Sequence, residues 1–233
     1  RPLASGKISP SLALFAALTF AVFSLALAKD LSPLFFFMVG AYLALQTLYS
    51  LGLKNLAIID ILVIAAGFII RVYAGAFVID AHLSVWFLLC VISVALFLAA
   101  GKRRAELNLL PSGVTRGSLT HYQGELLNSY VTMFGNAAWM SWALFTFFES
   151  PRASLPVWLF LAEISRATTV NKLLMVTIPV TIFGVMRYQS LIFEGRSEAP
   201  EKLLLTDIAL VSSIILWLGL VIWILYGGVA TYV

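Results

Sequence analysis

The fold is decided by residues 83–107, which read LSVWFLLCVISVALFLAA followed directly by GKRRAEL. The first eighteen residues carry no charge, and as a helix they extend about 27 Å, close to the thickness of a bilayer's hydrocarbon core. The last seven carry three cations and one carboxylate: Lys102, Arg103, Arg104 and Glu106. This stretch therefore predicts a transmembrane helix whose charged end meets water at the membrane surface.

The rest of the chain repeats this apolar pattern. Of the 233 residues, 61% are hydrophobic and 11% are charged, which is too apolar for a soluble domain. Seven stretches are suited to spanning a membrane, roughly over residues 11–28, 32–49, 57–78, 83–100, 126–148, 172–193 and 207–228. We therefore predict an all-α, polytopic helical membrane protein in which residues 1–233 form a single transmembrane domain.

Residue counts limit the available chemistry. The chain has one cysteine, Cys90, which excludes an internal disulfide, and its two histidines, His82 and His121, lack the spacing of a zinc or iron site. A metal required by the reaction would have to be a hard cation such as Mg²⁺, held by carboxylates and phosphates.

The distribution of Lys and Arg predicts the orientation in the membrane. If residues 1–10 lie in the cytosol, ten of the fifteen cations fall on the cytosolic side, four fall on the other side, and Arg71 lies inside a span. The positive-inside rule then places the 101–125 loop in the cytosol. The net charge of +4 follows from this topology and gives no argument for nucleic-acid binding. Residues 155–161, LPVWLFL, are too short to span and predict an interfacial helix on the outer face.

The charged end of the 83–107 stretch is the first candidate site. Spacings of three and four residues would bring Lys102, Arg103 and Glu106 onto one face if the helix continues beyond residue 100. A solvated ion-pair turn that only fixes orientation is the alternative. The same loop supplies three more polar side chains: Arg116, Tyr122 and Glu125. Together these groups favour a ligand rich in phosphate.

Charged residues near other spans have more than one interpretation. Lys54 and Asp60 flank the start of the third span, either as ligands or as a snorkelling lysine and a helix-capping aspartate. Arg187 lies near the cytosolic end of the sixth span and is either a membrane anchor or an anion ligand. Thr206 and Asp207 precede an apolar run and predict a helix N-terminus with an acidic residue in its first turn.

Arg71 lies deep inside a predicted span. It is about 21 Å along the helix from Ala57, and a cation at that depth is expected to face the bundle interior or a wet cavity and to have a partner. Asp60 shares nearly the same helical face but lies about 16 Å away along the axis. We therefore expect the partner of Arg71 on another helix.

Several of these segments resemble one known family. Residues 1–8, RPLASGKI, look like the segment that follows the first aspartate-rich motif of the UbiA prenyltransferase superfamily. Residues 49–54, YSLGLK, and residues 101–107, GKRRAEL, are similar to motifs of one bacterial branch, the decaprenyl-phosphate phosphoribosyltransferases. The resemblance covers essentially the whole chain and continues through Asp60, Arg71, Gly75, Thr115, Arg116, Leu119, Tyr122, Arg187, Tyr188 and residues 200–207.

The resemblance implies a bundle of nine transmembrane helices around a cavity open to the cytosol and to lipid. Seven of these helices would lie in this chain. The resemblance also implies a first aspartate-rich motif, which binds Mg²⁺ and diphosphate, upstream of Arg1, so no metal ligand is assigned here. We expect the chain without that motif to be catalytically inactive on its own.

The implied activity is transfer of a 5-phosphoribosyl group from 5-phosphoribosyl 1-diphosphate to a polyprenyl phosphate, with release of diphosphate and with Mg²⁺ as cofactor. The site would face the cytosol from a bacterial inner membrane. In this interpretation Glu106 is the catalytic residue, holding a ribose hydroxyl or a magnesium-bound water, and Lys102 and Arg103 clamp phosphate. Further substrate contacts are expected from Lys54, Arg116, Tyr122 and Arg187.

Two other functions remain open on sequence alone. An ordinary UbiA enzyme moves a prenyl group from a prenyl diphosphate to an aromatic or isoprenoid acceptor, and it needs an Asp-x-x-x-Asp pair that the 101–125 loop lacks. A transporter or non-catalytic membrane subunit is the other alternative. Transporters usually bury several ionisable groups near the midplane, whereas Arg71 is the only charge well inside a predicted span.

Overall fold

The structure is a computed structural model, and it describes residues 6, 9–108, 124–149, 172–194 and 205–227. Most of these residues belong to seven α-helices, α1 (Pro10–Leu31), α2 (Pro33–Leu51), α3 (Ile59–Val78), α4 (Val85–Asn108), α5 (Gly124–Phe148), α7 (Ile178–Phe193) and α9 (Ile208–Tyr226). Two short 3₁₀ segments are η1 (Leu53–Asn55) and η4 (Leu173–Thr177). The described residues contain no β-strand, so the predicted all-α fold is confirmed.

Six helical segments are long and apolar enough to cross a membrane: α1, α2, α3, α4, α9 and the continuous η4–α7 segment. Each overlaps one of the predicted apolar stretches. The predicted stretch at 126–148 corresponds to the seventh helix, α5, which has 25 residues. Helix α5 is not among these six apolar segments, because it mixes Asn, Ser, Thr and Gly with its apolar side chains. Helix α4 runs past the predicted boundary at residue 100, includes the whole GKRRAEL motif and ends at Asn108.

Serine and proline set the first helix boundaries. Ser9 caps α1, its Oγ accepting a hydrogen bond of 3.4 Å from the Leu12 amide, and Pro10 takes the first helical position, where no N–H is needed. Ser32 ends α1, and Pro33 begins α2 immediately afterwards. These residues produce a tight antiparallel hairpin.

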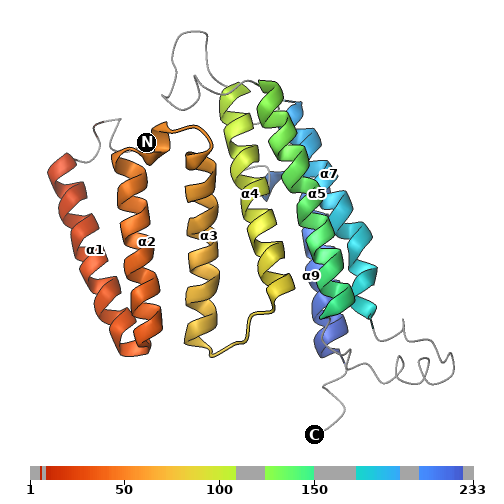
Figure 1. The fold of residues 1–233 in the computed structure, drawn as a ribbon, viewed down its shortest axis with the longest axis horizontal. Coiled ribbons are helices and arrows are strands. Elements are labelled where there is room, and N and C mark those ends of the chain that lie inside the picture. The colour runs from red at the N-terminus through yellow and green to blue at the C-terminus, as the bar shows by residue number, and fades with distance from the viewer. Residues whose placement is uncertain (1–5, 7–8, 109–123, 150–171, 195–204, 228–233) are drawn as a thin grey trace, which may run out of the picture.

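Successive helices run in opposite directions, so alternate connections share one side of the bundle (Figure 1). Helices α1, α2 and α3 stand side by side, and α4, α5, α7 and α9 form a second group that meets α3 through α4. The C-terminal ends of α2, α4 and α7 lie beside the N-terminal ends of α3, α5 and α9, at the top of Figure 1. We call this side the charged end, and we define it by Lys54, Asp60, Lys102, Arg103, Arg104, Glu106, Arg187 and Asp207.

The core lies where α4, α5 and α7 meet. Its buried side chains include Phe97, Leu127, Val131, Tyr188 and Ile192. A Cβ added to Gly101 would lie 2.7 Å from Cδ1 of Ile192 and 3.0 Å from Cε1 of Tyr188. The glycine of the GKRRAEL motif therefore lets α7 pack directly against the backbone of α4 near the charged end.

Of the two surroundings predicted for Arg71, the bundle interior or a wet cavity, the structure contradicts the bundle interior. Its side chain is exposed on the described structure instead of turned into the bundle interior. Its guanidinium donates a hydrogen bond to the Tyr42 hydroxyl and lies 4.8 Å from the centroid of the Tyr42 ring and 5.2 Å from that of Phe68. The expected partner on another helix is confirmed, since Tyr42 belongs to α2. An aromatic face and a hydroxyl thus replace the carboxylate that a buried cation would need.

Candidate active site

Arg103 is the centre of a buried ionic cluster that joins three helices at the charged end. Its side chain is 1% exposed, and its Nε lies 2.6 Å from Oδ2 of Asp60, a side chain that is completely buried in the first turn of α3. Nη2 donates a 2.6 Å hydrogen bond to the Tyr49 hydroxyl on α2, and Nη1 donates to Oε2 of Glu106 one turn further along α4. Each nitrogen group of the guanidinium therefore has a partner from a different helix or turn.

This geometry decides between the two interpretations of the motif. The predicted contact between Arg103 and Glu106 is present, but the pair is not a solvated turn, because Arg103 is buried. A buried charge needs oppositely charged and hydrogen-bonding partners. Arg103 has an ion pair with Asp60 through Nε and hydrogen bonds from Nη1 and Nη2, although Nε itself makes no hydrogen bond. Its guanidinium is thus already bound by Asp60, Tyr49 and Glu106. This geometry favours a role for Arg103 in positioning these side chains over the expected direct contact with a phosphate.

Glu106 is the outer member of this cluster. Its side chain is 25% exposed, whereas Asp60 is completely buried. Glu106 is therefore the carboxylate of this cluster that can be reached from outside the bundle, and it is the residue to which the family resemblance gives the catalytic role.

Asp60 reaches Arg103 through an unusual turn. The residue that precedes α3 is Ile58, whose φ of 69° lies in the left-handed region, an outlier for a β-branched side chain. Oδ1 of Asp60 accepts a hydrogen bond of 2.9 Å from the Ile61 amide. The interpretation of Asp60 as the helix cap is wrong, because Ile58 occupies the N-cap position and the second oxygen of Asp60 faces Arg103.

A second set of hydrogen bonds fixes the last turn of α4. Nε of Arg104 donates a 2.5 Å hydrogen bond to Oδ1 of Asn128 on α5, and Nη1 donates to the Asn108 side chain. Asn108 in turn donates through Nδ2 to the carbonyl of Ile192 on α7 at 3.2 Å. Because α4 is tied to α5 and α7 here, its charged turn is held in one position.

Lys54 and Lys102 are the other expected phosphate contacts at this end. Lys54 lies in η1, between α2 and α3, and Lys102 lies one residue before Arg103. Both residues are half-buried. The structure brings both lysines to the charged end with Glu106.

Arg187 is engaged by a carboxylate of the next helix. Its Nε and Nη2 donate to the two oxygens of Asp207 at 3.0 and 2.6 Å, a bidentate pair between α7 and the start of α9. Asp207 caps α9, its Oδ1 accepting a 2.9 Å hydrogen bond from the Leu210 amide, which confirms the predicted helix N-terminus. The hydrogen bond from Arg187, together with the one from Leu210, lowers the pKa of Asp207 below its ordinary value.

Other expectations lie outside the described residues. Arg116, Tyr122 and the predicted interfacial helix at 155–161 belong to segments that the structure does not describe. Within the described part of the chain, no three His, Cys, Asp or Glu side chains gather into a metal site. A Mg²⁺ ion at this end would therefore depend on phosphate oxygens for most of its ligands.

Sequence reasoning missed the pairing of Asp60 and Tyr49 with Arg103. Both residues were visible as polar side chains near the ends of apolar stretches on one side of the membrane. That shared side is the signal that could have suggested contact. Spacing rules could not supply it, because the residues belong to three different helices.

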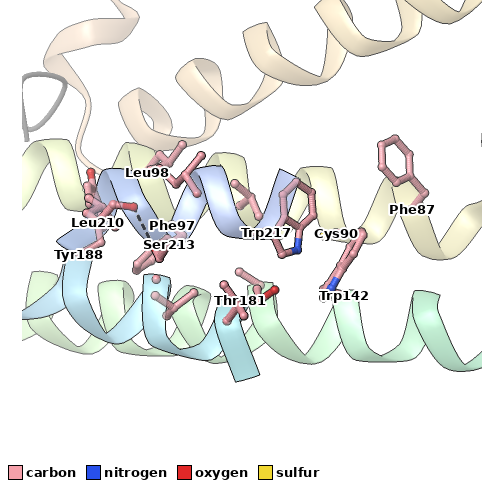
Figure 2. Close-up of a pocket in the computed structure, with 16 residues that line it drawn as sticks. Phe87, Cys90, Phe97, Leu98, Trp142, Thr181, Tyr188, Leu210, Ser213 and Trp217 are labelled. Carbon is pink, nitrogen blue, oxygen red and sulfur yellow. Dashed lines mark hydrogen bonds between the residues drawn. The ribbon is translucent and has the colours of Figure 1, made fainter. Parts of the chain in front are cut away.

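An apolar cavity of about 350 Å³ lies between α4, α5, α7 and α9 (Figure 2). Aromatic side chains contribute much of its wall: Phe87, Phe97, Trp142, Tyr188 and Trp217. Figure 2 shows Tyr188 and Leu210 at one end of this space and Phe87 at the other, so it extends along the bundle. Tyr188 also packs against Gly101, which places one end of the cavity beside the charged motif.

Comparison with known proteins gives consistent similarities. Residues 1–148 match the UbiA prenyltransferase family. The chain is 34% identical over 222 residues to decaprenyl-phosphate phosphoribosyltransferase of Mycolicibacterium smegmatis, covering 94% of this chain and 67% of that protein. The protein of the same name from Mycobacterium tuberculosis is 31% identical over 223 residues, covering 95% of this chain and 68% of its own length. The protein of the same name from Corynebacterium glutamicum is 32% identical over 191 residues, covering 81% of this chain and 53% of its own length.

Proposed function

Because this chain belongs to the UbiA prenyltransferase family, and is therefore a membrane-embedded transferase, we propose that it transfers a 5-phosphoribosyl group to a polyprenyl phosphate. The donor is 5-phosphoribosyl 1-diphosphate, the acceptor oxygen belongs to the lipid phosphate, and diphosphate leaves. The names of the three relatives support this choice within the family. Family membership also argues against the transporter alternative.

One structural observation carries the proposal: the charged end of α4 adjoins an apolar cavity. Tyr188 lines the cavity and packs against Gly101, and Lys102 and Glu106 follow Gly101 within two turns of the same helix. A lipid phosphate has the matching shape, with a charged head and an apolar chain. Its head would lie near the lysines, and part of its chain would lie along the aromatic walls.

The chemistry requires stabilisation of negative charge on the departing diphosphate. Fixed cations in a site with little water contribute strongly to such stabilisation, and Lys54 and Lys102 are placed to do so. Arg116, Tyr122 and Arg187 are proposed as further substrate contacts. Glu106 is proposed to hold a ribose hydroxyl or a magnesium-bound water, and Mg²⁺ would neutralise charge on the diphosphate.

The proposed setting is a bacterial inner membrane with the charged end toward the cytosol. Support comes from the ten-to-four distribution of cations and from the positions of Lys54, Lys102 and Arg187 in elements at one end of the bundle. This orientation gives a water-soluble phosphoribosyl donor direct access to Glu106.

The test uses membranes that contain the protein expressed from its complete gene. They receive Mg²⁺, labelled 5-phosphoribosyl 1-diphosphate and polyprenyl phosphate, and the label that enters the organic phase is counted. The proposal expects label only when both substrates are present. Transfer of a prenyl group from a prenyl diphosphate to an aromatic acceptor, without phosphoribosyl transfer, would contradict it.

Lys102→Ala tests the placement of the reaction at the charged end. It is expected to lower transfer at least about tenfold, because one fixed cation is lost, while the protein still inserts into membranes. Lys29→Ala is the matched control, since Lys29 is an exposed lysine in the last turn of α1 at the opposite end. Equal activity in both variants would remove Lys102 from the site.

A further inference from the structure

Asp60 is a carboxylate that the bundle buries completely, yet it does not cap its helix. Its Oδ2 lies 2.6 Å from Nε of Arg103, and both side chains are shielded from solvent. Burial of such a pair costs desolvation energy that its mutual attraction only partly offsets, so burial alone is a poor way to stabilise a fold. The turn before it also holds Ile58 at a φ of 69°, a strained conformation that persists only where the surroundings impose it.

The contacts between Asp60, Arg103 and Glu106 suggest a role for Asp60. Asp60 holds the guanidinium of Arg103 from α3, inside the bundle. Arg103 in turn donates a hydrogen bond through Nη1 to Glu106, which lies one turn further along α4. The position of Glu106 therefore depends on where Asp60 holds Arg103.

We propose that Asp60 is a positioning residue for the transfer reaction, acting through Arg103 to hold Glu106 in place. Tyr49 completes the arrangement, because its hydroxyl accepts the remaining Nη2 donor of Arg103 from α2. The inference rests on the proposed function in that it places the reaction at Glu106. It does not depend on which group is transferred.

The first test compares Asp60→Asn with the wild type, using the protein from its complete gene and counting only molecules that elute as folded protein in detergent. Asp60→Asn is expected to lower kcat about tenfold or more, because misplacement of a catalytic group is costly. The KM for 5-phosphoribosyl 1-diphosphate is expected to stay within about threefold, because Asp60 contributes no substrate contact. A wild-type kcat per folded molecule would overturn the proposal.

A double-variant cycle tests the route through Arg103. If Asp60 acts only through that residue, Asp60→Asn adds no further loss of kcat to Arg103→Gln, because the connection is already broken. Losses that multiply would show an independent role and overturn the proposal. Glu194→Gln is the matched control, since Glu194 is an exposed carboxylate just after α7 that accepts a hydrogen bond from Ser190.

Tyr49→Phe keeps the inference testable if Asp60→Asn does not fold. It preserves both buried charges and removes one hydrogen bond from Arg103, so kcat is expected to fall about threefold with an unchanged elution profile. An unchanged kcat in this variant would overturn the proposal. If the wild type transfers a prenyl group instead, the proposed function fails separately, and the same variants are measured on that reaction.

Discussion

Gly101→Ala tests the close packing of α4 against α7 that supports the charged end. The added methyl would lie 2.7 Å from Cδ1 of Ile192 and 3.0 Å from Cε1 of Tyr188. Ile192 can turn its terminal methyl away. Tyr188 cannot yield as easily, because it is 3% exposed and packs edge-on against Phe97 with 5.1 Å between ring centroids. We therefore expect α7 to move slightly away from α4.

The net cost follows from two opposing effects. Overpacking in a well-packed core costs about 1–3 kcal/mol. Alanine regains about 0.5–1 kcal/mol over glycine inside a helix. The expected net loss is about 1 kcal/mol, which corresponds to a Tm roughly 2–4 °C lower for a chain of this size.

Thermal unfolding in detergent, followed by tryptophan fluorescence, measures this change. Gly40→Ala in α2 is the matched control, because a Cβ at Gly40 meets no described atom within 4 Å and should raise the Tm slightly. The reasoning is refuted if Gly101→Ala melts at or above the wild type while Gly40→Ala behaves as expected.

Two further predictions concern the α7–α9 pair and the cavity. Because the folded-state pKa of Asp207 is lowered, its contribution to stability is present above the unfolded pKa of about 3.9 and is lost as pH falls through the lower folded value. Asp207→Asn should therefore flatten the fall in Tm over this acidic range, and melting curves that shift in parallel with pH would contradict the assignment. Val94→Trp narrows the cavity and should raise the KM for polyprenyl phosphate without changing the KM for the donor. Leu89→Trp, at an exposed position of α4 outside the cavity lining, should change neither, and equal effects would argue against lipid in the cavity.

The apolar stretches predicted the helices well because length and hydrophobicity are properties of a single segment. Helix ends were harder to predict where a helix continues beyond its apolar stretch into charged residues. The motif at 101–107 continues α4 to Asn108, because its residues find partners on α3, α5 and α7 that no local pattern reveals.

Contacts between helices were the part that sequence reasoning could not supply. The i, i+3 spacing identified Arg103 and Glu106 as neighbours, but Asp60 and Tyr49 reach Arg103 only through the packing of α2 and α3 against α4. For Arg71, burial in the bundle interior was expected but is not present. Its depth suggested the bundle interior, whereas the Tyr42 ring and hydroxyl hold it on an exposed face.

Donor choice tests the central claim most directly. Membranes containing the protein from its complete gene would be offered Mg²⁺, polyprenyl phosphate, an aromatic acceptor and two donors that carry different labels, 5-phosphoribosyl 1-diphosphate and a prenyl diphosphate. Our account predicts that phosphoribosyl label enters the lipid fraction in step with diphosphate release, and that no prenyl label moves. Transfer of the prenyl label alone to the aromatic acceptor would contradict it.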